Sequence, residues 1–344
     1  MTSTMLRDTT VVDRPRGTSF PGLVGVELRR LWWRRLAKAV LALTALLTIV
    51  SVFSAYQLSS PENVARALDE YTRQAQDIPQ MVQECEQAQQ QARGAGETTA
   101  DFGCDEIRAQ SLESMGIASP LPGAVFGGLV GVGVMSYAFL AFVLGASFIG
   151  AEFSTGSIGT WLTFQPRRIR VGLSKLAAST GGGLAVAATG VGLSGLGAWA
   201  IGVVNRPGSD LHLPSGLDVG EPLSHFVLRH VAIIAAAALV GGAVALLARN
   251  TGAVVGTAIG YTVVVEGILG QGFLMGKLNP WLLSTNITGF LQRGTTYQSM
   301  SCSASRCDSV TVPVSYTHSW LYLAVVAVLL VALSLAVFRR RDVG

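Results

Sequence analysis

Charged residues are scarce in this chain, and their scarcity excludes most soluble proteins. Only 13% of the 344 residues are Asp, Glu, Lys or Arg, whereas a soluble domain uses about a quarter. Half of the residues are hydrophobic and the mean hydropathy is +0.46, which excludes an intrinsically disordered chain. The 40 glycines have no three-residue period, so collagen is excluded too. The composition indicates a polytopic membrane protein.

Residues that could carry out catalysis or bind phosphate are also few. The four histidines form no HExxH motif or other dense ligand set, so we predict no metal site. No serine lies in a G-x-S-x-G turn, and Gly276-Lys277 lacks the preceding glycine of a P-loop. We therefore expect no catalytic residues, no cofactor bound by this chain and no unaided ATP hydrolysis. Nothing in the basic residues indicates nucleic-acid binding.

Six apolar segments are long enough to cross a membrane as helices. A helix needs roughly 20 apolar residues to span the ~30 Å hydrocarbon core. The alternation typical of outer-membrane strands is absent, so we predict an all-α polytopic membrane protein with six transmembrane helices. The segments are 39–58, 120–151, 176–205, 231–248, one that begins at 251 and is interrupted by Glu266, and 319–338.

The basic residues near the ends of these segments fall on one side of a six-span topology. They lie in residues 29–38, 167–175, 249 and 339–341. The positive-inside rule makes this the inner side. We therefore place the chain in a bacterial plasma (inner) membrane with both termini on the cytoplasmic side. Residues 1–21 are predicted to be a disordered tail, 22–338 the transmembrane domain and 339–344 a short second tail.

Residues 22–37 predict a helix that lies along the inner membrane surface before the first span. Apolar residues recur there at helical spacing, Trp prefers the headgroup level, and Arg reaches that level along its aliphatic stem. The alternative is that the first span simply continues into the cytoplasm. The residues expected at the interface are Arg29, Arg30, Trp32, Trp33 and Arg34.

The long outer segment 59–119 predicts an extracytoplasmic helical hairpin. Ser60-Pro61-Glu62 is a good helix start, Pro79 is expected to kink or split the first helix, and Gly94-Ala95-Gly96 to end it. A second helix is expected from Asp105 to Met115. The segment is acidic, and it is either a solvated spacer or a surface that binds substrate or a partner.

All four cysteines fall in segments that the charge distribution places outside. An oxidising compartment favours two disulfides. Three pairings are possible, and we favour the neighbours, Cys85 with Cys104 and Cys302 with Cys307. Four free thiols are the alternative, and the spacings match no common zinc site.

The fifth span contains two features of interest. A carboxylate in the bilayer costs ~2.5–3.5 kcal/mol, so Glu266 either handles substrate or protons, or it lies near the outer end of the span in a structural role. Gly252, Gly256 and Gly260 recur at every fourth residue, a spacing that lets helices approach closely. We expect them to pack within the chain, with contact across a dimer as the alternative.

The inner loop 152–168 predicts a short amphipathic helix. Thr155 or Ser157 can cap it, and Pro166 ends it. Its apolar residues Ile158, Trp161 and Leu162 share one face. We expect that face to dock in a groove on a soluble partner. We also expect Glu152 to pair with a basic residue of the interfacial helix, such as Arg30 or Arg34.

This loop resembles that of type-2 ATP-binding-cassette (ABC) exporter permeases. The matching residues are Glu152, Gly156, Ser157, Leu162, Pro166, Arg168 and Lys175. Such permeases have an interfacial N-terminal helix, six spans, cytoplasmic termini and a small last outer loop, here 272–317. Trp161-Leu162 replaces the family's usual Leu-Leu, and the outer insertion is long.

The resemblance implies a permease that moves its substrate outward. It also implies a dimer with an identical or related permease chain, and two copies of a separate ABC ATPase subunit that bind ATP and Mg²⁺ and contact loop 152–168. Two alternatives are an ion-coupled secondary transporter that uses Glu266, and a non-transporting membrane assembly protein that recruits a partner.

Overall fold

The computed structural model describes residues 19–94, 102, 104, 122–164, 167–205, 222–269, 276–302 and 307–340. The predicted tails, apart from residues 19–21 and 339–340, and the predicted helix 105–115 lie outside this part of the chain.

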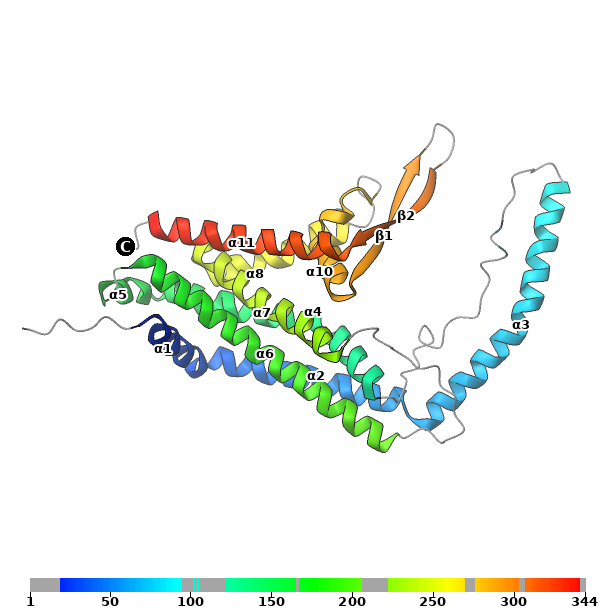
Figure 1. The fold of residues 1–344 in the computed structure, drawn as a ribbon, viewed down its shortest axis with the longest axis horizontal. Coiled ribbons are helices and arrows are strands. Elements are labelled where there is room, and N and C mark those ends of the chain that lie inside the picture. The colour runs from blue at the N-terminus through cyan, green and yellow to red at the C-terminus, as the bar shows by residue number, and fades with distance from the viewer. Residues whose placement is uncertain are drawn as a thin grey trace, which may run out of the picture.

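Six of the helices in the described chain are long and apolar enough to cross a membrane, as predicted. They run alongside one another in Figure 1. The six are α2 (Arg35–Leu58), α4 (Pro122–Ser154), α6 (Arg168–Val204), α7 (Leu223–Ala248), α8 (Thr251–Gly260) with its π-helical continuation η2 (Tyr261–Leu269), and α11 (Tyr316–Arg340).

The two ends of this helical bundle carry different helices and strands. Helices α1 (Phe20–Trp33) and α5 (Ser157–Phe164) lie at one end with the last turn of α11, whereas α3 (Pro61–Gly94) and the strands β1 (Gly294–Cys302) and β2 (Cys307–Ser315) lie at the other (Figure 1). The segments that the charge distribution assigned to opposite sides of a membrane are therefore at opposite ends of the molecule.

Helix α4 is at the centre of the bundle and packs against α2, α6 and α7. Its apolar window is 61% buried, the largest share of any candidate span in the described chain. Glycine makes this packing close. A Cβ atom on Gly145 of α4 would overlap the carbonyl oxygen of Ala238 on α7, and one on Gly241 of α7 would overlap that of Phe142. Small residues let membrane helices pack this closely.

The glycines of α8 do not pack within the described chain, so our expectation for them was wrong. No described atom lies within 4 Å of a Cβ built on Gly256 or Gly260, and a Cβ on Gly252 meets only the side chain of Asn250. Val254 is the one buried residue that the structure describes on α8. The four-residue spacing of the glycines predicted a helix face without side chains, but it did not specify which helix packs against that face.

The outer insertion begins with one long helix rather than a split one. Helix α3 continues through Pro79 and ends at Gly94, so the split that we considered at Pro79 does not occur. Proline removes one backbone hydrogen bond, and in an exposed helix water can satisfy the freed carbonyl. The predicted disulfide between Cys85 and Cys104 is present.

Strands β1 and β2 form an antiparallel hairpin that the sequence interpretation missed. The overall architecture is all-α as predicted, but alternation typical of strands does occur in residues 294–315. Tyr297 lies opposite Val312 and Thr295 opposite Val314, and such residues favour strands. Pro313 is tolerated because β2 pairs with β1 alone in the described sheet.

The hairpin register also places the Cα atoms of Cys302 and Cys307 opposite each other. Their side chains lie outside the described part of the structure, so this disulfide stays a prediction. Between η2 and the hairpin lie a 3₁₀ turn (η4, Asn279–Trp281) and α10 (Leu283–Leu291).

The contact between Gly145 and Ala238 predicts that Gly145→Ala destabilises the bundle. The added methyl group must push a backbone carbonyl away, and overpacking of this kind costs about 1–3 kcal/mol. We expect a lower midpoint of thermal unfolding in detergent. Gly131→Ala is the matched control on the same helix, because a Cβ there meets no described atom. Equal midpoints for the two variants would contradict the packing.

Candidate functional site

Three helices bring charged side chains together beside the loop 152–168. Helix α1 begins after Ser19, whose Oγ accepts a hydrogen bond from Gly22 N, and its buried residues are Leu23, Glu27 and Leu31. Glu152 lies in the last turn of α4, two residues before the helix ends at Ser154. Lys175 lies two turns into α6. The packing of these helices therefore brings residues far apart in the sequence into contact.

Lys175 occupies the centre of this arrangement. Its Nζ donates to Glu27 Oε1 at 2.9 Å and to Glu152 Oε2. The Lys175 side chain and both carboxylates are essentially inaccessible to solvent. A buried charge without a partner costs several kcal/mol, so the three groups depend on one another.

Arg30 in the last turn of α1 and Arg34 in the α1–α2 turn complete what we call the ion cluster (Glu27, Arg30, Arg34, Glu152 and Lys175). Arg34 Nη2 donates to Glu152 Oε1 at 3.0 Å. Arg30 Nη1 lies 3.7 Å from Glu152 Oε1 and 3.6 Å from Glu27 Oε2. The contact that the sequence suggested between Glu152 and these arginines is present. Three cations surround two carboxylates, so the cluster has a net formal charge of +1.

Burial lowers the pKa of the Arg34 guanidinium, and attraction to Glu152 opposes this shift, while repulsion from Arg30 adds to it. An arginine stays protonated in proteins in spite of such shifts. We therefore treat Arg34 as a permanent cation facing Glu152.

Aromatic rings pack against the cations of the cluster. The Arg30 guanidinium carbon lies 5.2 Å from the ring centroid of Trp161 on α5, and that of Arg34 lies 4.8 Å from the ring of Phe148 on α4. Such cation–π contacts are attractive. Trp161 thus joins α5 to α1 through Arg30.

Helix α5 is closely connected to the end of α4. Gly156 turns the chain with φ = +67°, a conformation that glycine adopts without steric cost. The hydroxyls of Thr155 and Ser157 donate to the carbonyls of Ala151 and Glu152. The two residues that we expected to cap α5 therefore serve the last turn of α4.

The apolar face of α5 is turned toward the chain itself, which corrects our expectation that it docks on a partner. Ile158 is 1% exposed and belongs to the main hydrophobic core, and Trp161 is partly buried. The exposed residues of the segment include Thr155, Thr160 and Thr163. Any partner that binds here meets this polar face. The side chain of Leu162 and the whole of Pro166 lie outside the described structure, and Arg168 begins α6.

Helix α1 has one face in the bundle and one face exposed. The buried face carries Glu27, which the sequence interpretation passed over, whereas Trp33 is 71% exposed. The signal was present, because Leu23, Glu27 and Leu31 recur at every fourth residue and place a carboxylate among leucines. The central role of Lys175 was likewise not foreseen.

Glu266 has a structural partner at the other end of the bundle. Its Oε1 accepts from the backbone N–H groups of Leu283 at 2.9 Å and Ser284 at 3.2 Å, and its Oε2 accepts from the Ser284 hydroxyl. It therefore caps the first turn of α10, where N–H groups have no partner within the helix. Of our two interpretations of Glu266, these contacts favour the structural one.

Metal-binding residues are not grouped in the described part of the chain, where no three His, Cys, Asp or Glu side chains come together. Compared with models of known protein families, with curated proteins and with solved structures, the chain matches none. The ion cluster and the exposed face of α5 are thus the structural features that bear on function.

Lys175→Met is predicted to destabilise the protein strongly, because it leaves two carboxylates buried without their shared cation. Removing one partner from a buried ion pair costs about 3–5 kcal/mol, which should appear as a large loss of folded protein or of thermal midpoint in detergent.

The matched control is Lys277→Met, since Lys277 is exposed. Adding Glu27→Gln to Lys175→Met should recover part of the stability, because it removes one of the unpaired charges. A Lys175→Met variant as stable as the control would show that the ion cluster does not stabilise the fold.

Proposed function

We propose that this chain is the membrane-spanning permease subunit of an ABC transporter, and that it works as an exporter. The observation that carries the proposal is the ion cluster, which binds α1, α4 and α6 together directly beside α5. Helix α5 lies at the end of the bundle, packs against α4 and contacts α1 through Trp161 and Arg30, so it is suited to receive force from a soluble partner.

The connections explain how displacement of α5 would reach the bundle. Loop 152–168 leads directly from α4, the central span, into α6. Glu152 in the last turn of α4 contacts Lys175 of α6 and Arg34 of the α1–α2 turn. A push on α5 would therefore move the ends of α4 and α6 together, and it would tilt these spans as rigid bodies.

ATP binding and hydrolysis are assigned to a partner, an ABC ATPase subunit present in two copies. ATP and Mg²⁺ would be held there, since the sequence has no P-loop. Closure of the ATPase dimer would shift the permease population between two conformations, one open to the inside and one open to the outside. The polar face of α5, with Thr160 and Thr163, is the surface that we assign to this contact.

We assign a second permease chain, identical or related, to the exposed face of α8. A Cβ atom built on Gly256 or Gly260 meets no described atom within 4 Å, so this face of α8 has room for another helix. Small residues at this spacing allow close helix contact. The molecule is placed in a bacterial plasma membrane with α1, α5 and both termini on the cytoplasmic side. Helices α1 and α5 occupy the same end of the bundle, which supports this placement (Figure 1).

The alternative of an ion-coupled secondary transporter has less support. It requires a carboxylate that is free to exchange protons or bind substrate within the membrane. The contacts of Glu266 with Leu283 and Ser284 give that carboxylate a structural role instead.

Reconstitution tests the proposed function. The tagged chain is purified from native membranes in mild detergent, and co-purifying subunits are identified by mass spectrometry. We expect a subunit with a P-loop whose ATPase activity changes when this chain is present in the same proteoliposomes. Transport by the isolated chain, driven by an ion gradient without any ATPase, would overturn the proposal.

Thr160→Arg is predicted to weaken the contact with the ATPase while leaving the fold intact, because the side chain is exposed on α5. An unpaired charge in a protein interface costs several kcal/mol, so we expect at least a tenfold loss of ATPase subunit retained on the purified permease.

Thr296→Arg provides the control for this substitution, since Thr296 is exposed on β1 at the opposite end of the bundle. Equal retention of the ATPase subunit by the two variants would exclude α5 as its binding surface.

Gly256→Leu is predicted to weaken the dimer of permease chains. The leucine side chain would hold apart two helices that otherwise meet across a glycine, and overpacking costs about 1–3 kcal/mol. The measurement is the monomer–dimer equilibrium in detergent by light scattering. Ala324→Leu adds bulk to an exposed position of α11 and is the control. A dimer that tolerates Gly256→Leu as well as the control places the second chain elsewhere.

A further inference from the structure

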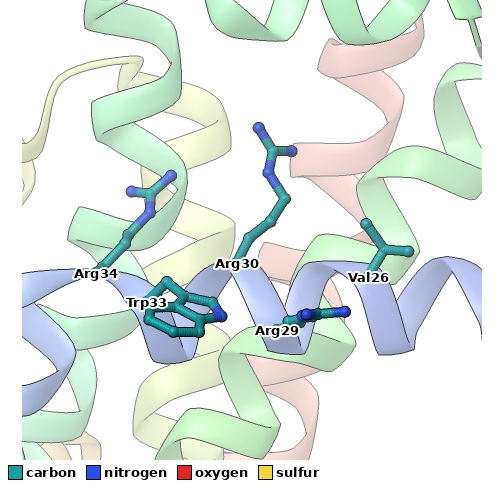
Figure 2. A pocket seen from close by; sticks show the side chains of 5 residues that line it. All are labelled: Val26, Arg29, Arg30, Trp33 and Arg34. Atoms are coloured by element: carbon teal, nitrogen blue, oxygen red, sulfur yellow. The ribbon is translucent and has the colours of Figure 1, made fainter.

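A surface hollow lies along α1, at the end of the bundle that carries α5. Its volume is about 530 Å³. Figure 2 shows the side chains that line it, with those of Arg30 and Arg34 on one side of the helix and that of Trp33 between them. The lining residues are Val26, Arg29, Arg30, Trp33 and Arg34.

The hollow has an excess of positive charge. Arg30 and Arg34 belong to the ion cluster, whose cations already outnumber its carboxylates. Arg29 is exposed and makes no ion pair or hydrogen bond with any residue that the structure describes. Guanidinium groups bind phosphate oxygens in bidentate fashion, so the ligand that fits this chemistry is a phosphate.

An apolar surface begins where the hollow ends. Trp32, Trp33 and Leu36 are exposed beside it, and the exposed residues of α2 continue this surface along the first span. Only 22% of the apolar window of α2 is buried. Beyond Leu36, the exposed apolar residues of α2 include Leu43, Leu46, Leu47, Ile49, Val50 and Phe53.

We propose that the hollow binds the phosphate of an anionic phospholipid, with the acyl chains along α2. A free phosphate or a nucleotide would use the arginines alone, whereas an amphiphile uses both the cationic hollow and the apolar surface beside it. Tryptophan at the headgroup level fits the same ligand. The inference requires residence in a membrane, and it does not depend on the proposed transport function.

A bound lipid phosphate would also act on the ion cluster. Arg30 and Arg34 line the hollow (Figure 2), and their guanidinium groups also lie 3.7 Å and 3.0 Å from Glu152 Oε1. An anion in the hollow would offset the net positive charge that these arginines give the cluster. The lipid would thus stabilise the α1–α2 turn in the position that holds Glu152.

The experiment measures lipid binding to the full chain. The protein is reconstituted in nanodiscs made of phosphatidylcholine with or without phosphatidylglycerol, released into detergent, and analysed for retained lipid by native mass spectrometry. We expect selective retention of phosphatidylglycerol. Arg29→Gln should reduce it about fivefold, the effect of one basic residue near an anionic surface. Arg29→Lys, which keeps the charge, should retain more lipid than Arg29→Gln.

Arg35→Gln is the matched control, because Arg35 is exposed on the neighbouring helix and does not line the hollow. Three results would overturn the proposal: equal retention of the two lipids, equal loss in Arg29→Gln and Arg35→Gln, or displacement of the lipid by inorganic phosphate. The last result would identify a soluble phosphate compound as the ligand. Because Arg29 contacts no described partner, its replacement should leave the thermal midpoint unchanged, and that midpoint is measured in parallel.

Discussion

A lysine buried between two glutamates determines how this molecule is held together at the end that carries α5. Lys175 bonds to Glu27 and Glu152, and each comes from a different helix. None of the three charges is stable there without the others, because desolvation of a lone ion costs several kcal/mol. The arrangement therefore requires α1, α4 and α6 to keep their relative positions, and any shift among them must be concerted.

The second constraint is close packing between helices, which depends on small residues and not on charged side chains. Gly145 and Gly241 let α4 and α7 meet backbone to backbone, without a polar side chain between them. In lipid there is little hydrophobic drive for helices to associate, so van der Waals contact between small residues provides much of the attraction. The bundle is thus fixed by ion pairs at one end and by glycine contacts along its middle.

The three exposed surfaces to which we assign binding partners are separate from the packed core. The hydroxyl-rich face of α5, the smooth face of α8 and the basic hollow of α1 are each adjacent to the well-packed core but separate from it. A substitution on one of these surfaces can alter an interaction without unfolding the bundle, whereas one in the ion cluster cannot. This division is typical of proteins whose scaffold is rigid and whose contacts are made at its edges.

Hydropathy and charge in the sequence were sufficient for the six spans, the grouping of α1 and α5 at one end, and the pairing of Glu152 with Arg34. These features depend on composition and on residues near in the chain or opposite in charge. The sequence did not determine the shared partner Lys175, the direction of the apolar face of α5, or the fact that Gly256 meets no other side chain among the residues that the structure describes. Periodicity specifies which residues share a helix face, but only tertiary packing decides what that face meets, since contact energies depend on neighbours distant in sequence.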